Sequence, residues 1–223
     1  MKLIFFGPPG SGKGTYAARV GPILGIPQIS TGDLLRTEVA NGTDLGNKAD
    51  EYMKKGELVP DKLVIDMLEK RLEKSDCKNG YILDGFPRTI EQMKELERFA
   101  EIDLVILFGM PEAFLIEKAL ARRVCEKCGD VYNIAHIRKG KVDLPPVAPK
   151  VPGICNKCGG KLIQRKDDNE KVIRDRIETY KNQSLPLLEY YKKKDLVREV
   201  EVIGPPEVMV PITIETIKKA LGK

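Results

Sequence analysis

Short apolar runs alternate along the chain with segments in which apolar residues recur every three to four positions. The first pattern is typical of buried strands and the second of amphipathic helices. The runs expected to form strands are Lys2–Gly7, Ile26–Ile29, Tyr81–Leu83, Asp103–Phe108 and Val197–Ile203. Strands that alternate with helices predict the α/β class, here a five-stranded parallel sheet flanked by helices on both faces.

The helical pattern fills most of the sequence between these runs. The segments expected to form helices are Gly14–Leu24, Leu34–Ala40, Leu63–Leu72, Ile90–Phe99, Ala113–Arg122, Glu170–Tyr191 and Ile212–Leu221. Pro186 lies inside the longest of them, and a proline at such a position is expected to kink or interrupt the helix.

Two stretches depart from the alternation, which indicates subdomains inserted into one core domain. Residues 30–59 carry helical signal with no strand, and residues 122–167 are rich in Gly, Pro and Cys. The remaining segments, 1–29, 60–121 and 168–223, are expected to form the core.

Composition narrows the class of protein. Of the 223 residues, 42% are apolar and 32% are charged, as in soluble globular proteins. The net charge of +5 is a mild excess, which suits small polyanions better than nucleic acid. The apolar run at the start is too short for a signal peptide, and no window approaches the roughly 20 residues of a membrane span. We therefore expect a cytoplasmic protein with no membrane or nucleic-acid partner and no obligatory protein partner.

A glycine-rich segment, Gly7-Pro-Pro-Gly-Ser-Gly-Lys-Gly-Thr15, follows the first expected strand and opens a helix. Its spacing is that of a phosphate-binding P-loop, in which backbone N–H groups and a lysine, here Lys13, hold the phosphates of a nucleotide. Gly14 occupies the position of the usual magnesium-binding hydroxyl, and Thr15 comes one residue later.

Arginines in distinctive contexts suggest that the acceptor is itself a phosphate. They are Arg36, Arg88, Arg123, Arg165 and Arg176. Two polyanions approach each other only when fixed cations neutralise them, and the arginine fork binds phosphate oxygens bidentately. A phosphate acceptor needs no general base, so the presence of only one histidine agrees with this hypothesis. Any single arginine could instead form an ordinary surface ion pair.

In order and spacing, the motifs resemble the adenylate kinase family over essentially the whole chain. The segments that carry the resemblance are Gly7–Thr15, Ile29–Arg36, Leu83–Thr89 and Arg165–Asp168. The resemblance implies reversible transfer of the γ-phosphoryl group of ATP to AMP, which gives two ADP and uses Mg²⁺ bound with ATP. It makes residues 30–59 the monophosphate-binding subdomain and 122–167 a lid whose closure excludes water.

The resemblance also assigns roles to individual residues. Those placed on ATP are Gly10, Ser11, Gly12, Lys13, Gly14, Thr15, Arg123 and Tyr132. Those placed on AMP are Thr31, Arg36, Glu57, Leu58, Val59, Gly85, Arg88, Gln92, Arg165 and Arg176. The catalytic set is Lys13, Arg88, Arg123, Arg165 and Arg176 around the transferred phosphoryl, with Asp84 ordering magnesium-bound water. Gln92 would read the adenine edge, and Tyr132 would lie beside the ATP adenine or simply pack inside the lid.

Four cysteines form two knuckles within the second insertion, Cys125-x-x-Cys128 and Cys155-x-x-Cys158, each followed by glycine. Such pairs are typical of a closed structural zinc site, and a zinc lid is a variant of the family that the chain resembles. Two disulfides or four free thiols are the alternatives, His136 could replace one ligand, and thiolates also accept iron or cobalt.

Other parts of the sequence have weaker interpretations. Cys77 is expected to be a buried packing residue. The stretch Leu144–Pro152, in the long spacer between the knuckles, has no predicted role.

Two alternative functions remain open. A kinase of the same fold could take UMP, CMP or dTMP as acceptor, or GTP as donor. A zinc-ribbon nucleic-acid-binding protein switched by ATP would also use the knuckles and the lysines around them. The acceptor-side residues Thr31, Arg36, Arg88 and Gln92 argue against that second alternative.

Overall fold

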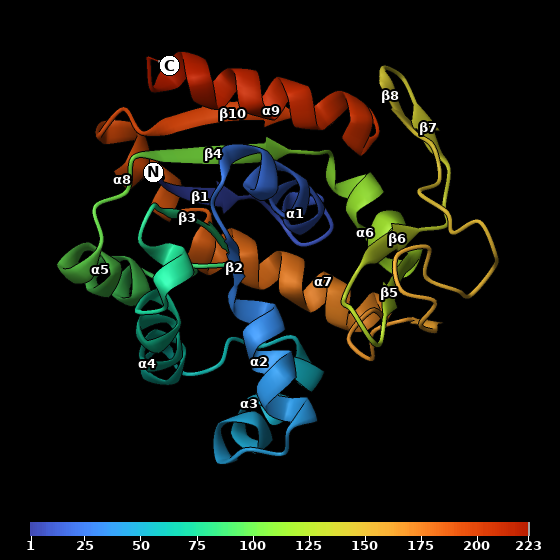
Figure 1. The fold of residues 1–223 in the computed structure, drawn as a ribbon, viewed down its shortest axis with the longest axis horizontal. Coiled ribbons are helices and arrows are strands. Elements are labelled where there is room, and N and C mark those ends of the chain that lie inside the picture. Colours follow the sequence, from blue (N-terminus) through green and yellow to red (C-terminus); the bar gives the residue numbers. More distant parts are fainter. Residues whose placement is uncertain (223) are drawn as a thin grey trace.

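A computed structural model describes residues 1–222 and has a parallel five-stranded sheet at its centre (Figure 1). Across the sheet the order is β10 (Val197–Glu201), β4 (Leu104–Gly109), β1 (Lys2–Phe6), β3 (Tyr81–Asp84) and β2 (Gln28–Ser30). Each strand is parallel to its neighbours, so the predicted fold class is confirmed. Within residues 1–222, no helix combines the length and the apolar character needed to cross a membrane.

The central position of β1 explains why its sequence is continuously apolar. It lies between β3 and β4, with Leu3 opposite both Ile82 and Leu104. The side chains from Leu3 to Phe6 are at most 4% exposed. A strand that is covered on both faces has no position for a polar residue.

The helices include all the expected segments with shifted boundaries, and α3 is an additional helix within residues 30–59. They are α1 (Lys13–Leu24), α2 (Thr31–Ala40), α3 (Asp44–Lys55), α4 (Asp61–Leu72), α5 (Ile90–Phe99), α6 (Glu112–Leu120), α7 (Glu170–Thr179), α8 (Leu187–Lys193) and α9 (Pro206–Ala220). A 3₁₀ turn, η1 (Ser75–Cys77), precedes β3, and a π-helical turn, η2 (Tyr180–Ser184), follows α7.

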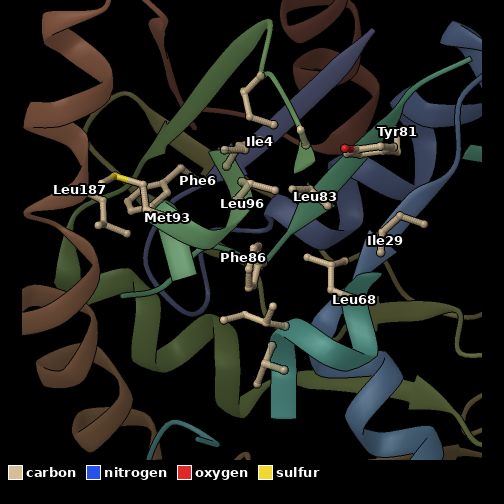
Figure 2. Packing of buried hydrophobic residues seen from close by; sticks show 14 of the residues in the cluster. Ile4, Phe6, Ile29, Leu68, Tyr81, Leu83, Phe86, Met93, Leu96 and Leu187 are labelled. Carbon is tan, nitrogen blue, oxygen red and sulfur yellow. The ribbon is translucent and has the colours of Figure 1, made fainter. Parts of the chain in front are cut away.

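Two apolar clusters fix the helices to the sheet. Leu3 and Phe5 of β1 belong to the cluster formed with α1 and α9, whereas Ile4 and Phe6 belong to the cluster formed with α4, α5 and α8. Figure 2 shows the second cluster, to which the sheet also contributes Leu83. Alternate residues of one strand therefore anchor opposite layers of the molecule.

The long helix expected over residues 170–191 is interrupted, and Pro186 lies at the break. Leu185 N donates to Tyr180 O at 2.8 Å, a bond that spans five residues instead of four. Helix α8 starts directly after Pro186, which has no N–H to continue the earlier turn. Helix α9 also begins six residues earlier than expected, with Pro206 in its first turn, where a proline is tolerated.

The second insertion consists mainly of short antiparallel strands. Its three-stranded sheet has the order β6 (Val131–Asn133), β5 (Arg122–Cys125) and β9 (Leu162–Ile163), and a separate hairpin joins β7 (Ile137–Lys139) to β8 (Val142–Leu144). The helix predicted to end at Arg122 stops at Leu120, because Arg122 already pairs with Asn133 in this sheet.

The β7–β8 hairpin packs against the core. Ile137, Val142 and Leu144 are buried in the cluster that contains α9 and β10. Asp143 N donates to Ile203 O at 3.0 Å, which adds a backbone bond to the core. In Figure 1 the hairpin lies beside one end of α9. The long spacer with no predicted role thus contains a segment docked on the core.

Candidate active site

The glycine-rich loop turns sharply between β1 and the first turn of α1. Gly10 and Gly12 have φ values of 88° and 93°, a region that glycine adopts without strain. A Cβ atom on Gly10 would lie 2.6 Å from the carbonyl oxygen of Leu115, so no side chain fits there. The hydroxyl of Ser11 is buried and has no hydrogen-bond partner within residues 1–222. The loop therefore keeps donors free at a helix N-terminus, where anions bind favourably.

Lys13 is the cation of this loop, and its pKa is lowered to about 8. Loss of hydration is the largest cause; nearby Arg88 and Arg176 lower it further, and Asp84 opposes the shift. Its Nζ atom donates to the carbonyl of Pro8 at 3.3 Å. The charged form is thus less favoured than in a free lysine, although it still predominates below pH 8, and a bound anion would favour it further.

Asp84 lies close to Gly14 of the P-loop. The carboxylate lies at the end of β3, is 8% exposed and accepts a 3.0 Å hydrogen bond from Gln28 Nε2. A Cβ atom on Gly14 would be only 2.8 Å from Asp84 Oδ2. A serine or threonine here would require the Asp84 carboxylate to shift.

Thr31 and Arg88 converge on the backbone at Gly85. The carbonyl oxygen of Gly85 accepts from Thr31 Oγ1 at 2.9 Å and from Arg88 Nε at 2.7 Å. Burial lowers the pKa of Arg88 to about 10, and Arg176 adds to the effect. A guanidinium group whose charge is this poorly compensated favours an anionic partner.

Further arginines line the same region, each held by an aspartate. Arg36 Nη2 and Arg165 Nη2 lie 2.5 Å and 3.3 Å from Asp33 Oδ1. Arg176 Nη1 lies 2.7 Å from Asp167 Oδ2.

The pKa values of these groups show crowding of positive charge. Burial lowers the pKa of Arg165 to about 10, and repulsion from Arg36 and Arg122 contributes. Burial alone would raise the pKa of Asp33, but Arg36 and Arg165 bring it below its usual value. The structure therefore concentrates guanidinium groups at one place, as phosphate binding requires.

Nine of the ten residues that we placed on AMP line one cavity. They are Thr31, Arg36, Glu57, Leu58, Val59, Gly85, Arg88, Gln92 and Arg176. A second cavity, which includes Lys13 and Gly7 of the P-loop, shares Gly85, Arg88 and Arg176 with the first. A donor phosphate chain and an acceptor phosphate would thus meet at the shared arginines. Contacts between these residues and a nucleotide stay a prediction.

Comparison with known proteins identifies the family of this chain. A family model described as adenylate kinase matches residues 5–196. The chain belongs to the adenylate kinase family. It is 48% identical to an adenylate kinase of Archaeoglobus fulgidus over 90% of each chain, and 46% identical to one of Thermodesulfovibrio yellowstonii over 92% of this chain and 93% of that one. An adenylate kinase of Caldicellulosiruptor saccharolyticus is 44% identical over all of this chain and 99% of its own.

Several residues of this adenylate kinase family member escaped the sequence analysis. Arg122 forms an ion pair with Asp168, which is 2% exposed, and it also lowers the pKa of Lys13. By contrast, the guanidinium of neighbouring Arg123 donates to the carbonyls of Leu120 and Arg122. The sequence shows two adjacent arginines here, Arg122 and Arg123, but it does not indicate which of them forms the ion pair with Asp168. The role of Arg123 on ATP stays a prediction.

Lys118 is a second missed residue. Its Nζ atom donates to the carbonyl of Ser11 in the P-loop at 3.4 Å, and burial lowers its pKa to about 8. It comes from α6, more than 100 positions away in the sequence, so no local pattern could connect it to the loop.

The four cysteines of the lid come together without forming disulfides. Their sulfur atoms lie within 4.8 Å of one another, with Cys125 and Cys158 at 3.5 Å and Cys128 and Cys155 at 3.6 Å. A tetrahedron with metal–sulfur bonds of about 2.3 Å has edges of about 3.8 Å. The donor set therefore fits a tetrahedral metal site. His136 lies apart from the four sulfurs and bonds to Asp143 at 2.8 Å.

Tyr132 packs inside the lid. Its side chain is 4% exposed, and its hydroxyl accepts from Asn156 N at 2.8 Å and lies 3.5 Å from Cys155 Sγ. The structure thus agrees with the packing alternative, and the predicted contact with ATP adenine stays untested. Cys77 lies outside the cluster, 5% exposed, as expected of a packing residue.

Proposed function

We propose that the chain catalyses the reversible reaction of ATP with AMP to give two ADP. An oxygen of the AMP phosphate attacks the γ-phosphorus of ATP. The bond from that phosphorus to the β,γ-bridging oxygen breaks, and ADP leaves. The observation that carries this proposal is the pair of adjoining cavities that share Arg88 and Arg176. Because the attacking oxygen already carries negative charge, fixed cations suffice and no general base is needed.

Each part of the site would have a separate task. The P-loop amides and Lys13 would hold the ATP phosphates, and Arg36 and Arg88 would hold the AMP phosphate. Arg165 and Arg176 would stabilise the charge that spreads over the transferred group.

Two metal ions fit the residues present. Mg²⁺ would enter with ATP, and Asp84, a nearly buried carboxylate beside Gly14, would orient its water ligands. Zn²⁺ would be held in the lid by Cys125, Cys128, Cys155 and Cys158. The zinc would stiffen the lid, which has little apolar core of its own. Cysteine pairs arranged as metal ligands favour a reducing, cytoplasmic location.

The proposal is tested by measuring nucleoside diphosphate formation from ATP with AMP, CMP, UMP or dTMP. We expect AMP to give the highest kcat/KM and to yield two ADP for each ATP consumed. Higher kcat/KM with a pyrimidine acceptor would transfer the assignment to another kinase of the fold. Salt-dependent binding of RNA or DNA without turnover would favour the zinc-ribbon alternative.

The pKa of Lys13 predicts a pH dependence for this reaction. Below pH 8 the lysine of the free enzyme is protonated and attracts phosphate, and above pH 8 it loses its charge. We therefore expect kcat/KM for ATP to be flat up to about pH 7.5 and to fall by up to about tenfold per pH unit above 8. Bound ATP raises the pKa again, so kcat itself should stay flat to higher pH.

Lys118 provides the control for this profile, because its pKa is also about 8. In Lys118→Met the decline above pH 8 should persist if Lys13 causes it. A profile of that variant without any decline would contradict the assignment to Lys13.

A further inference from the structure

The side-chain amide of Gln92 is held at both of its ends. Its Nε2 donates to Asp61 Oδ1 at 2.8 Å, and its Oε1 accepts from the backbone N–H of Arg88, also at 2.8 Å. The second oxygen of Asp61 accepts from Thr89 Oγ1 at 2.8 Å, and that hydroxyl caps α5 by accepting from Gln92 N. Gln92 is 2% exposed, so these partners replace water.

The two partners of the amide have fixed and opposite character. A carboxylate such as Asp61 only accepts hydrogen bonds, and the backbone N–H of Arg88 only donates one. Turning the amide over would place its oxygen against the carboxylate and its NH₂ group against the N–H. Both contacts would then be repulsive, so one orientation is strongly preferred.

The hydrogen bonds to Asp61 and to the backbone of Arg88 leave one donor and one acceptor site of the Gln92 amide unused. The NH₂ group of Gln92 has a second hydrogen, and its oxygen has a second lone pair. The residue lines the acceptor cavity together with Leu35, Val59 and Val64, so the base of an acceptor would lie against it. The fixed orientation determines on which side of the amide the donor lies and on which side the acceptor.

This order of donor and acceptor matches one class of base. Adenine presents an amino donor beside a ring-nitrogen acceptor, and asparagine or glutamine pairs with it bidentately. Hypoxanthine, the base of IMP, has a carbonyl acceptor in place of the amino group and is otherwise the same size. AMP and IMP therefore form a matched pair of probes for the orientation of the amide.

We propose that Asp61 is a positioning residue that sets the choice of acceptor base by holding the Gln92 amide in one orientation. This inference rests on the proposed transfer to AMP. Asp61 is also the first residue of α4, so the test must separate selectivity from a structural role.

The experiment measures kcat and KM for AMP and IMP, with ATP as donor, in the wild type, Asp61→Leu, Asp61→Ser and Asp61→Asn. Leucine and serine remove the acceptor that Gln92 Nε2 uses. Asparagine keeps it, because its oxygen can accept from Gln92 while its NH₂ group faces the Thr89 hydroxyl. Two variants without the acceptor keep the test valid if one of them fails to fold, as judged by circular dichroism.

We expect Asp61→Leu and Asp61→Ser to reduce the ratio of kcat/KM for AMP over IMP by about tenfold, the factor for one hydrogen bond. Most of the change should lie in KM for AMP, KM for ATP should stay constant, and Asp61→Asn should keep the ratio within about threefold. An unchanged ratio in the first two variants, or an equal loss in Asp61→Asn, overturns the proposal. If the wild type turns over neither AMP nor IMP, the proposed function fails instead.

Discussion

Replacing Arg88 with alanine is expected to lower kcat by about 10²- to 10³-fold, the usual effect of removing one donor that stabilises a transition state. Arg88 lines both cavities, so in the proposed reaction it would contact the acceptor phosphate and the transferred group. Its depressed pKa indicates that the protein alone compensates its charge poorly. The compensation would come from the phosphates, and most completely when they meet in the transition state.

Arg88→Ala should change the free energy of unfolding only slightly. The carbonyl of Gly85, which Arg88 Nε contacts, keeps its bond from Thr31 Oγ1 at 2.9 Å. Alanine also removes a cation from the vicinity of Lys13 and Arg176. Steady-state kinetics together with thermal unfolding measure the two effects separately.

Arg174→Ala serves as the matched control for Arg88→Ala. Arg174 lies on α7, is largely exposed and, among residues 1–222, pairs only with Glu170, so its loss should leave kcat within about twofold. Arg88→Lys should give an intermediate rate, because lysine keeps the charge but loses the fork. Near-normal turnover in Arg88→Ala would exclude the role that we assign to this residue.

Removing the metal that we propose for the lid is expected to lower the free energy of unfolding substantially. Metal at a thousandfold excess over its Kd contributes about 4 kcal/mol to the folded state. In a chain of this size, about 4 kcal/mol corresponds to a fall in Tm of about 8–16 °C. Chelation, or Cys128→Ser, should produce a fall of that order. Activity measured well below Tm should decline less, because the cysteines lie in the lid and outside both cavities.

Elemental analysis identifies the metal and supplies the decisive control. Cys77→Ala removes the cysteine that lies outside the cluster, so it should leave about one metal ion per chain. Purified protein without metal, or a Tm that does not respond to chelation, would contradict the metal site.

Patterns that are local in sequence predicted most of the fold. The residues of β1 from Leu3 to Phe6 are all apolar, with no alternation of polar positions, which predicted a strand covered on both faces. The structure buries all four of these side chains. The boundaries of α9 were less predictable. Pro211 lies inside the helix and Pro206 in its first turn, and prolines in a sequence normally indicate the end of a helix.

The parts of the candidate site that are contiguous in the sequence could be predicted from it. Glycines at fixed spacing indicated the P-loop, and arginines beside turn motifs indicated the acceptor side. Residues that act through others were not predictable in this way. Asp61 contacts Gln92 across 31 positions, and Arg122 contacts Asp168 across 46, so these pairs exist only after folding.

The hairpin of β7 and β8 changes how the lid is joined to the core. A flap inserted into a chain ordinarily has two connections, one where the chain enters and one where it leaves. Here the chain enters the lid sheet at Arg122, leaves it after Asn133 for the docked hairpin, and returns at Val147, which bridges to Asn133. It leaves a final time near Arg165, so the backbone crosses the boundary between the lid sheet and the core four times. If this lid swings during the proposed reaction, four crossings would restrict its pivot to an axis that passes near all of them, whereas two would also permit twisting.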